Sequence, residues 1–430
     1  MRPNITELVV NKDKCIGCGV CDTICPVNVL NMDFNSFGIY SPVESEGCLD
    51  KCTLCMDICP FIEENDNEYK IATKLYANET NVIYHHELGY FVETLEIVKK
   101  DENERLKSAS GGAGNAILTT LLDRDIVDKV LTVESFSNPD KLFQFNVFSS
   151  STELNNTKGS VYYPTELSEV LDYVLDNDGR YAITVLPCYA KAIRLAQGKN
   201  VKLRKRIKVI IGLVCGQMKS KQFTESLSKI AIGNHRPNEV KYRMKQPTKY
   251  SNQYALQFKN TLVHKENIID WTAYSNKFWT SRLFTPLACN HCIDTFALTA
   301  DISLMDAWLP EYTKDYRGHT LVIVRSNALK EIILTQNDVS IKNIPYEKVY
   351  ESQKGVVQNK HYFVNGTYNP IKKLIVLIKI KIQKLSHQSD WDENTIERYI
   401  IFIKLLEKLN ALLLIPKRIA SKIFMKGFLK

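Results

Sequence analysis

Hydrophobic and polar positions follow two alternating patterns over most of the chain. Short runs of apolar and β-branched residues are followed by longer segments in which apolar residues recur at helical spacing. The clearest examples are the run "RYAITVLP" (180–187) followed by "CYAKAIRLAQ" (188–197), and the runs "IKVIIGLVCG" (207–216), "ADISLMD" (300–306) and "HTLVIVR" (319–325). Strands that alternate with helices are typical of α/β folds. An α/β domain is therefore predicted over residues 75–365.

Both ends of the chain depart from this pattern. Residues 1–66 contain short apolar runs separated by turns, and the polar stretch "EENDNEYK" (63–70) looks like the exit from a separate small module. Residues 366–430 form a tail of helical, amphipathic pattern. Its most apolar stretch, "YIIFIKLLEKLNALLLI" (399–415), contains three charged residues and is shorter than the roughly 20 apolar residues that span a bilayer. No transmembrane helix is expected.

The positive charge is concentrated in the tail. The whole chain has a net charge of +8, and residues 371–430 contain thirteen Lys or Arg and five Asp or Glu, so that 13 − 5 = +8. The balanced remainder argues against a nucleic-acid-binding body. A basic amphipathic helix is typical of contact with a membrane surface or a partner. The alternative is a helical pair that packs on the catalytic domain.

The twelve cysteines indicate metal ligation rather than disulfides. The N-terminus lacks an apolar signal sequence, and the chain is long and rich in Lys and Glu, unlike a secreted disulfide scaffold. A cytoplasmic protein is expected, with peripheral contact at the inner face of the membrane if the tail binds there.

Eight of the cysteines lie in an internal repeat. "CIGCGVCDTICP" has the C-x2-C-x2-C-x3-C spacing of bacterial ferredoxins and ends in proline, and "CLDKCTLCMDICP" repeats it with one extra residue after its first cysteine. The repeat resembles the two-cluster ferredoxin family, which implies an α+β ferredoxin-like module over residues 1–66. The resemblance implies two 4Fe–4S clusters, one held by Cys15, Cys18, Cys21 and Cys59 and the other by Cys25, Cys48, Cys52 and Cys55. Structural zinc is the alternative.

The four remaining cysteines fall at chemically suggestive places. Cys188 and Cys215 each follow an apolar strand-like run, and Cys289 and Cys292 lie in the loop "CNHC". If both strands belong to one parallel sheet, their cysteines emerge at the same edge, where α/β folds place ligands. Four cysteines there would suit a third 4Fe–4S cluster. A cysteine at a strand end is also commonly a buried small hydrophobe, and C-x-x-C pairs commonly bind zinc.

A wider resemblance covers residues 105–360. In order along the chain, the matching motifs are "SASGG" with "DIVDKV", "VLPC", "GLVCG", "YRMK", "CNHCIDTFALTADISLMDAW" and "SQKG". Together they resemble the family of beta subunits of deazaflavin-coenzyme-reducing hydrogenases and dehydrogenases. That resemblance implies an iron–sulfur protein that contains FAD, and it favours the third cluster. The chain departs from the family where Leu304 and Met305 precede Asp306, because the family typically has Val-Gly before this aspartate.

Seven residues are expected to contact the flavin. Small residues before a helix let the backbone approach a phosphate, and the helix N-terminus offers free N–H groups; the alternative is an ordinary helix start with Ser110 as N-cap. The basic pair in "YRMK" would bind phosphate or stabilise the reduced flavin, with a solvated strand edge as the alternative. The expected contacts are Ser108, Ser110, Gly111, Gly112, Arg243, Lys245 and Asp306.

These parts together predict a flavin-dependent iron–sulfur oxidoreductase. Single electrons from the clusters would be coupled through FAD to a two-electron substrate, either a small organic molecule or a deazaflavin coenzyme. Likeness to proteins encoded beside bacterial surface-polysaccharide genes suggests a role there. The alternative is a non-catalytic electron-transfer subunit whose partner performs the chemistry, and a third possibility is a zinc-stapled binding protein. A ferredoxin or another subunit is the expected redox partner.

Overall fold

The computed structural model describes residues 4–364, except 158 and 273, together with 370–386 and a few residues between 397 and 408. Its centre is an eight-stranded sheet with strand order β15-β5-β14-β13-β9-β8-β6-β7. The bounds of these strands are β5 (Glu93–Lys99), β6 (Lys129–Ser135), β7 (Phe143–Phe148), β8 (Tyr181–Val185), β9 (Ile207–Leu213), β13 (Ile302–Asp306), β14 (Thr320–Val324) and β15 (Val339–Asn343). The predicted α/β domain is confirmed as a mixed α/β fold.

The four central strands β6, β8, β9 and β13 run parallel, and their outer neighbours run antiparallel. Parallel strands are buried on both faces and therefore read as continuous apolar runs. One face packs on α5 (Ala113–Asp123) and α12 (Asn327–Leu334). The other face packs on α6 (Ser168–Asp176) and α7 (Pro187–Lys199). The carboxyl ends of β8, β9 and β13 consequently meet at one edge of the sheet, as the sequence predicts for β8 and β9.

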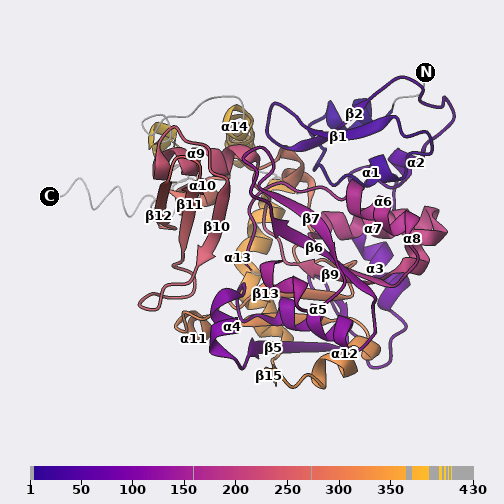
Figure 1. Ribbon diagram of the computed structural model, residues 1–430. Coiled ribbons are helices and arrows are strands. Elements are labelled where there is room, and N and C mark those ends of the chain that lie inside the picture. Colours follow the sequence, from indigo (N-terminus) through magenta and orange to yellow (C-terminus); the bar gives the residue numbers. More distant parts are fainter. Residues whose placement is uncertain are drawn as a thin grey trace, which may run out of the picture.

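A second, three-stranded antiparallel sheet stands beside the first in Figure 1. It consists of β10 (Glu239–Met244), β11 (Ala255–Asn260) and β12 (Lys265–Asp270). Aromatic and aliphatic side chains of its inner face pack on α9 (Lys221–Ile232) and α10 (Ser275–Thr280). This sheet forms one wall of the cavity described below.

The N-terminal segment lies against α6 and α7 (Figure 1). It contains a short π-helix η1 (Thr6–Val10), the helices α1 (Val20–Thr23) and α2 (Leu54–Asp57), and the antiparallel hairpin β1 (Leu30–Phe34) with β2 (Tyr40–Glu44). The expected polar exit contains the start of a helix, α3 (Glu68–Tyr76), with the Asn67 side chain accepting from the Lys70 amide as N-cap. A ferredoxin-like fold for this segment, and the bounds of the three predicted domains, stay predictions.

One hydrophobic core runs from the N-terminal segment into the α/β domain. Ile5, Val20 and Ile58 belong to the same buried cluster as Leu167 and Ile193. Apolar burial stabilises by roughly 25 cal/mol per Å², so the N-terminal segment is held by the same interactions that hold the sheet. It is not a loosely tethered appendage.

The last helices described are α13 (Tyr346–Val364) and α14 (Pro370–Ser386). Gln383 on α14 is buried and donates to the carbonyl of Thr285 at 2.6 Å, and Lys384 pairs with Asp13 at 2.8 Å. This part of the tail therefore packs on the body, as the alternative interpretation holds. The expected amphipathic segment beyond residue 386 lies almost entirely outside the described residues. Among the residues described, no helix combines the length and apolarity that crossing a bilayer requires.

The remaining elements are short and lie at the periphery of the two sheets. Their bounds are β3 (Ile83–His85), β4 (Gly89–Phe91), α4 (Glu102–Lys107), η2 (Glu153–Thr157), α8 (Val201–Arg206), η3 (Leu287–His291) and α11 (Pro310–Thr313).

Candidate functional site: three cysteine quartets and a cavity

The eight N-terminal cysteines form two separate groups, each around its own small cavity. One cavity is lined by Cys15, Cys18, Cys21 and Cys59, and the other by Cys25, Cys48, Cys52 and Cys55. The fourth cysteine of each repeat has thus changed places with its counterpart, as the ferredoxin resemblance implies. We call these groups the first and second quartets.

Local backbone geometry explains how the first quartet closes. Gly17 and Gly19 adopt positive φ values of 73° and 81°, which residues with a Cβ rarely adopt. A Cβ on Gly17 would lie 2.3 Å from the carbonyl oxygen of Tyr40. The turn can therefore lie flat against β2 only with glycine at this position.

The other four cysteines also converge, and they form the third quartet. Cys188 lies in the first turn of α7, directly after β8, and Cys215 follows β9. Cys289 lies within the 3-10 helix η3, and Cys292 follows it at once. Burial raises the pKa of the Cys215 thiol to about 12, and the neighbouring Cys289 and Cys292 thiols contribute to the shift. The predicted parallel pairing of β8 and β9 is confirmed, and Cys188 lies close enough to Cys292, Cys215 and Cys289 for their charges to act on it.

A glycine in β9 brings the "CNHC" segment to the sheet edge. A Cβ on Gly212 would lie 2.3 Å from the Cβ of Ala297 and 2.8 Å from that of Ala300. The chain after Cys292 can therefore lie directly on β9, the strand that precedes Cys215. Among the described residues, no three His, Cys, Asp or Glu side chains stand close enough together to hold a single metal ion.

The first and third quartets are neighbours across the shared core. Both Cys18 and Cys188 raise the pKa of the fully buried Tyr189, after the larger effect of burial itself. The Tyr189 hydroxyl donates to the carbonyl of Thr165 at 2.7 Å, and the Leu167 amide donates to the carbonyl of Cys18 at 3.0 Å. Tyr189 therefore lies close to a thiol of each group, and Cys18 also acts on Cys188 directly.

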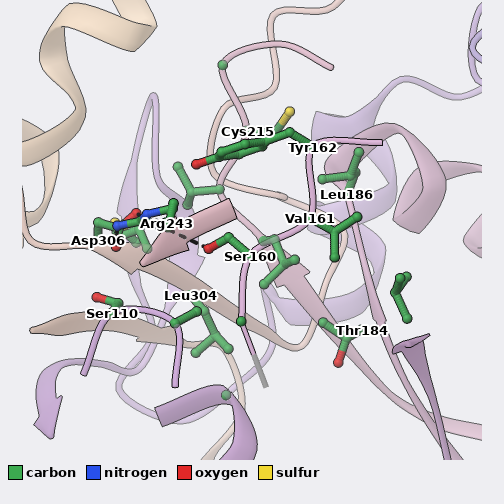
Figure 2. A pocket seen from close by; sticks show the side chains of 18 of the residues that line it. Ser110, Ser160, Val161, Tyr162, Thr184, Leu186, Cys215, Arg243, Leu304 and Asp306 are labelled. Atoms are coloured by element: carbon green, nitrogen blue, oxygen red, sulfur yellow. Dashed lines mark hydrogen bonds and ion pairs between the residues drawn. The ribbon is translucent and has the colours of Figure 1, made fainter. Parts of the chain in front are cut away.

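A cavity of about 710 Å³ opens beside the third quartet. Figure 2 shows Cys215 in its lining together with the pair of Arg243 and Asp306. Its volume lies within the range typical of cofactor sites. An adjoining lobe of about 550 Å³ shares some of its lining, including Ser110, Arg243 and Asp306. The sheet edge, the loop before α5 and the small sheet together enclose the two lobes.

Aromatic side chains form one wall of the cavity, and none of them was expected from the sequence. They come from separate parts of the chain and have no common spacing, and only Trp308 lies within a quoted motif, as its last residue. These residues are Tyr162, Tyr254, Trp271, Trp279 and Trp308.

The loop before α5 lies at the cavity, but its serine hydroxyls already donate hydrogen bonds to backbone carbonyls. Ser108, Ser110 and Gly112 line the cavity. The Ser108 hydroxyl donates to the carbonyl of Glu104 at 2.7 Å, and the Ser110 hydroxyl donates to the carbonyl of His319. The N-cap of α5 is Gly112, at φ 90°, so the alternative of Ser110 as N-cap is wrong. Gly111 is buried between β5 and β14, and its amide donates to Thr320 Oγ1 at 2.9 Å.

Arg243 and Asp306 meet as a two-pronged ion pair, with both N–O distances 2.7 Å. The guanidinium also lies over the rings of Tyr254 and Trp308, 4.9 and 5.3 Å from their centroids. Asp306 reaches the cavity from the carboxyl end of β13. Asp301, at the other end of that strand, pairs instead with Arg194 at 2.7 Å. Arg243 therefore faces the cavity with its charge already balanced.

Lys245 lines the adjoining lobe and donates to the carbonyls of Arg105 and Ser110, at 2.5 and 2.6 Å. Burial lowers its pKa to about 7, and the positive charges of Arg243 and Arg105 act in the same direction. In the unfolded chain a lysine titrates near 10.4. Between about pH 7 and pH 10 the unfolded state thus binds more protons than the folded state, and stability rises with pH.

A Lys245→Met variant is expected to lose this pH-dependent contribution. The free energy of unfolding of the parent should rise more steeply between pH 7 and pH 9 than that of the variant, as measured by urea denaturation. Lys241→Met, at an exposed position of β10, the strand just before Lys245, is the control and should keep the parental slope. Equal slopes for all three proteins would contradict a depressed pKa at Lys245.

Comparison with known protein families was consistent with this architecture. Residues 95–172 and 178–346 match the models for the N-terminal and C-terminal parts of the coenzyme F420 hydrogenase/dehydrogenase beta subunit. Residues 7–75 match a 4Fe–4S dicluster domain.

Two curated relatives are similar over most of the chain. One subunit of the F420H2 dehydrogenase of Methanosarcina mazei is 23% identical over 72% of this chain and 80% of its own length. A coenzyme F420-dependent sulfite reductase of Methanocaldococcus jannaschii is 22% identical over 78% of this chain, but the match covers only 47% of that protein.

Among solved structures, a chain of the F420-reducing [NiFe] hydrogenase complex from Methanosarcina barkeri has a similar fold. The TM-score is 0.51 at 16% identity, over 66% of this chain and 94% of that one. This similarity supports the fold alone. None of the relatives named here concerns surface polysaccharides.

Proposed function

The chain belongs to the family of coenzyme F420 hydrogenase/dehydrogenase beta subunits, and from this premise we propose that it is an iron–sulfur electron-transfer subunit of a larger redox complex. The observation that carries the proposal is the convergence of twelve cysteines into three quartets, the third of which opens on the cavity. The sequence alone favours a flavin-dependent iron–sulfur oxidoreductase, whereas the relatives favour the alternative, an electron-transfer subunit. Two of them are, by name, a subunit and part of a complex.

The three quartets are proposed to hold one 4Fe–4S cluster each. In such a cluster each thiolate binds a different iron, so the sulfurs stand further apart than the ligands of one zinc ion. The dicluster match supports the first two clusters. The third is supported by the donor set, four thiols gathered where β8 and β9 end.

The position of each quartet suggests the route of the electron. Cys48 of the second quartet is exposed, whereas Cys21 and Cys59 of the first are buried. The third quartet adjoins the first through Tyr189 and lines the cavity through Cys215. We therefore infer the order surface, second quartet, first quartet, third quartet, cavity, with one electron moving at each step.

The cavity is proposed to bind a flavin, and its lining fits the ring better than the diphosphate. Aromatic rings and small residues form a wall suited to a planar ring system. Within the described part of the chain the Thr184 hydroxyl, which lines the cavity, has no hydrogen-bond partner and is available to a ligand. By contrast, both serine hydroxyls and Arg243 are already paired. A bound flavin would couple one-electron to two-electron transfer.

The adjoining lobe is the proposed place for the two-electron partner of the flavin. The names of the relatives make a deazaflavin coenzyme one candidate, and a different small organic molecule remains the other. Leu304 and Met305, which stand in place of the family's Val-Gly, line the main cavity. Their bulk would alter the fit of a ligand at this wall.

Iron, sulfide, zinc and flavin content per chain after anaerobic purification tests the proposal. Three clusters predict about twelve irons, and Cys215→Ser is expected to retain about eight because it loses a ligand of the third cluster alone. Cys48→Ser should also retain about eight, but with the third cluster intact by spectroscopy. About eight irons and one zinc in the parent would overturn the third cluster, and twelve irons without flavin would leave an electron-transfer subunit whose cavity serves another ligand.

A further inference from the structure

Two buried cations, Arg282 and Lys360, flank the third quartet. A third basic side chain, Lys219, is also buried close to Cys289, but burial lowers its pKa well below the usual range and Arg282 acts in the same direction. Lys360 on α13 places its Nζ 3.3 Å from the Sγ of Cys292 and 2.5 Å from the carbonyl oxygen of Asp294. Arg282 precedes η3; burial lowers its pKa, and the nearby thiols of Cys289, Cys215 and Cys292 act in the opposite direction. Arg282 and Lys360 are each only 3% exposed.

Neither cation forms an ion pair with a carboxylate among the described residues. The Arg282 guanidinium donates to the side chain of Asn290 at 3.1 Å and lies 4.3 Å from the ring centroid of Phe363. Its Nε and Nη1 have no hydrogen-bond partner within the described part of the chain. A buried charge is costly unless an opposite charge balances it. Four thiolates with their cluster would provide that negative charge.

The N-terminal quartets lie among negative charges instead. Glu166 raises the pKa of Cys18, after larger effects from burial and from the thiol of Cys59. Glu44 and Asp50 act in the same direction on Cys48. Lys191 is a cation close to Cys59, and it is already paired with Glu68 at 3.1 Å.

Two buried carboxylates act on Cys292, and one of them, Glu68, is already paired with Lys191. The other, Asp294, lies near Cys292 and accepts from the amide of Leu298 at 3.0 Å. Its charge can balance Lys360 but leaves Arg282 uncompensated. The third quartet therefore lies in a more positive environment than the other two.

We propose that Arg282 and Lys360 raise the reduction potential of the third cluster above those of both N-terminal clusters, so that electrons entering at the surface collect beside the cavity. The inference rests on the proposed function, because it requires a cluster at the third quartet. Reduction adds one negative charge to a cluster, and a nearby cation stabilises that form, whereas exclusion from water disfavours it. The two cations have to outweigh the burial of this site. In the transfer one electron leaves a reduced N-terminal cluster, which is oxidised, and reduces the third; no bond breaks and no proton moves.

A redox titration of the full chain, followed by electron paramagnetic resonance, tests the inference. Arg282→Gln and Lys360→Met are each expected to lower the ratio of reduced to oxidised third cluster at a fixed poise by at least about tenfold, which is 59 mV for a one-electron couple. The N-terminal clusters should keep their potentials. Arg282→Lys keeps the charge and should restore most of the parental potential.

Lys354→Met is the matched control, because Lys354 lies on an exposed face of the same helix as Lys360. It should leave all three potentials unchanged. If every variant binds twelve irons and the reduction potential of the third cluster is unaltered, the inference is wrong and the proposed function stands. Eight irons in the parent would overturn both. If Arg282→Gln does not fold, Lys360→Met alone decides the outcome.

Discussion

The free energy of unfolding of an Arg243→Met variant is expected to be about 3 kcal/mol lower than that of the parent. The reason is the isolated charge that the substitution leaves behind. Asp306 would keep its carboxylate at the cavity wall, with a side chain only 21% exposed, after losing two hydrogen bonds of 2.7 Å. Breaking a buried pair typically costs about 3–5 kcal/mol, and water in the cavity should hold the cost to the lower end.

Urea denaturation of a double-mutant cycle measures this effect. Arg243→Met/Asp306→Leu removes both charges and should be more stable than Arg243→Met alone, because an apolar pair leaves no isolated charge. Lys348→Met breaks the exposed pair with Glu311 at 2.8 Å and should change stability far less, because exposed ion pairs contribute little. If Arg243→Met lowers the free energy of unfolding no more than Lys348→Met does, the ion pair of Arg243 and Asp306 does not stabilise the fold.

Gly111→Ala is expected to destabilise the chain by about 3 kcal/mol, at the upper end of the range for overpacking. A Cβ there would lie 2.6 Å from the carbonyl oxygen of Ile97 and 2.8 Å from the amide nitrogen of Thr320. Both atoms belong to strands hydrogen-bonded within the large sheet, β5 and β14, so neither can move without disturbing the ladder. From the sequence Gly111 is expected to contact the flavin, whereas the structure gives it a packing role between two strands.

Gly198→Ala is the control, because it makes the same substitution at a position where the added Cβ has room. Gly198 lies in α7, and a Cβ there would meet nothing within 4 Å. Because alanine favours a helix over glycine by up to about 1 kcal/mol, this variant should equal or exceed the parent in stability. Thermal unfolding of the two variants side by side gives the result, and similar melting temperatures would refute the clash at Gly111.

The sequence predicts those parts of the fold whose apolar pattern is continuous. β8, β9, β13 and β14 are buried runs, and each was predicted from its residues. The three-stranded sheet was not recognised, because β12 has the sequence "KENIID" and is mostly exposed. Although β12 lies against α9, a strand whose side chains are mostly exposed offers no hydrophobic period to read.

The candidate site likewise has residues that the sequence predicts and residues that it does not. Cysteine is rare and its spacing is restrictive, so the three quartets follow from motifs and from the parallel arrangement of β8 and β9. Arg282 and Lys360 could not be predicted, since nothing near them in the sequence marks a buried cation. Their role depends on α13 and η3 meeting in space. The aromatic wall of the cavity is a tertiary feature of the same kind.

The shared core between the N-terminal segment and the α/β domain has a consequence for kinetic order. A separate ferredoxin must find its partner by diffusion, so its reaction depends on concentration and, for charged surfaces, on ionic strength. Here Cys18 and Cys188 are held as neighbours within one folded chain, and the encounter has become intramolecular. Transfer between the first and third quartets should therefore be a first-order process at any dilution, and only delivery to the exposed second quartet should respond to salt.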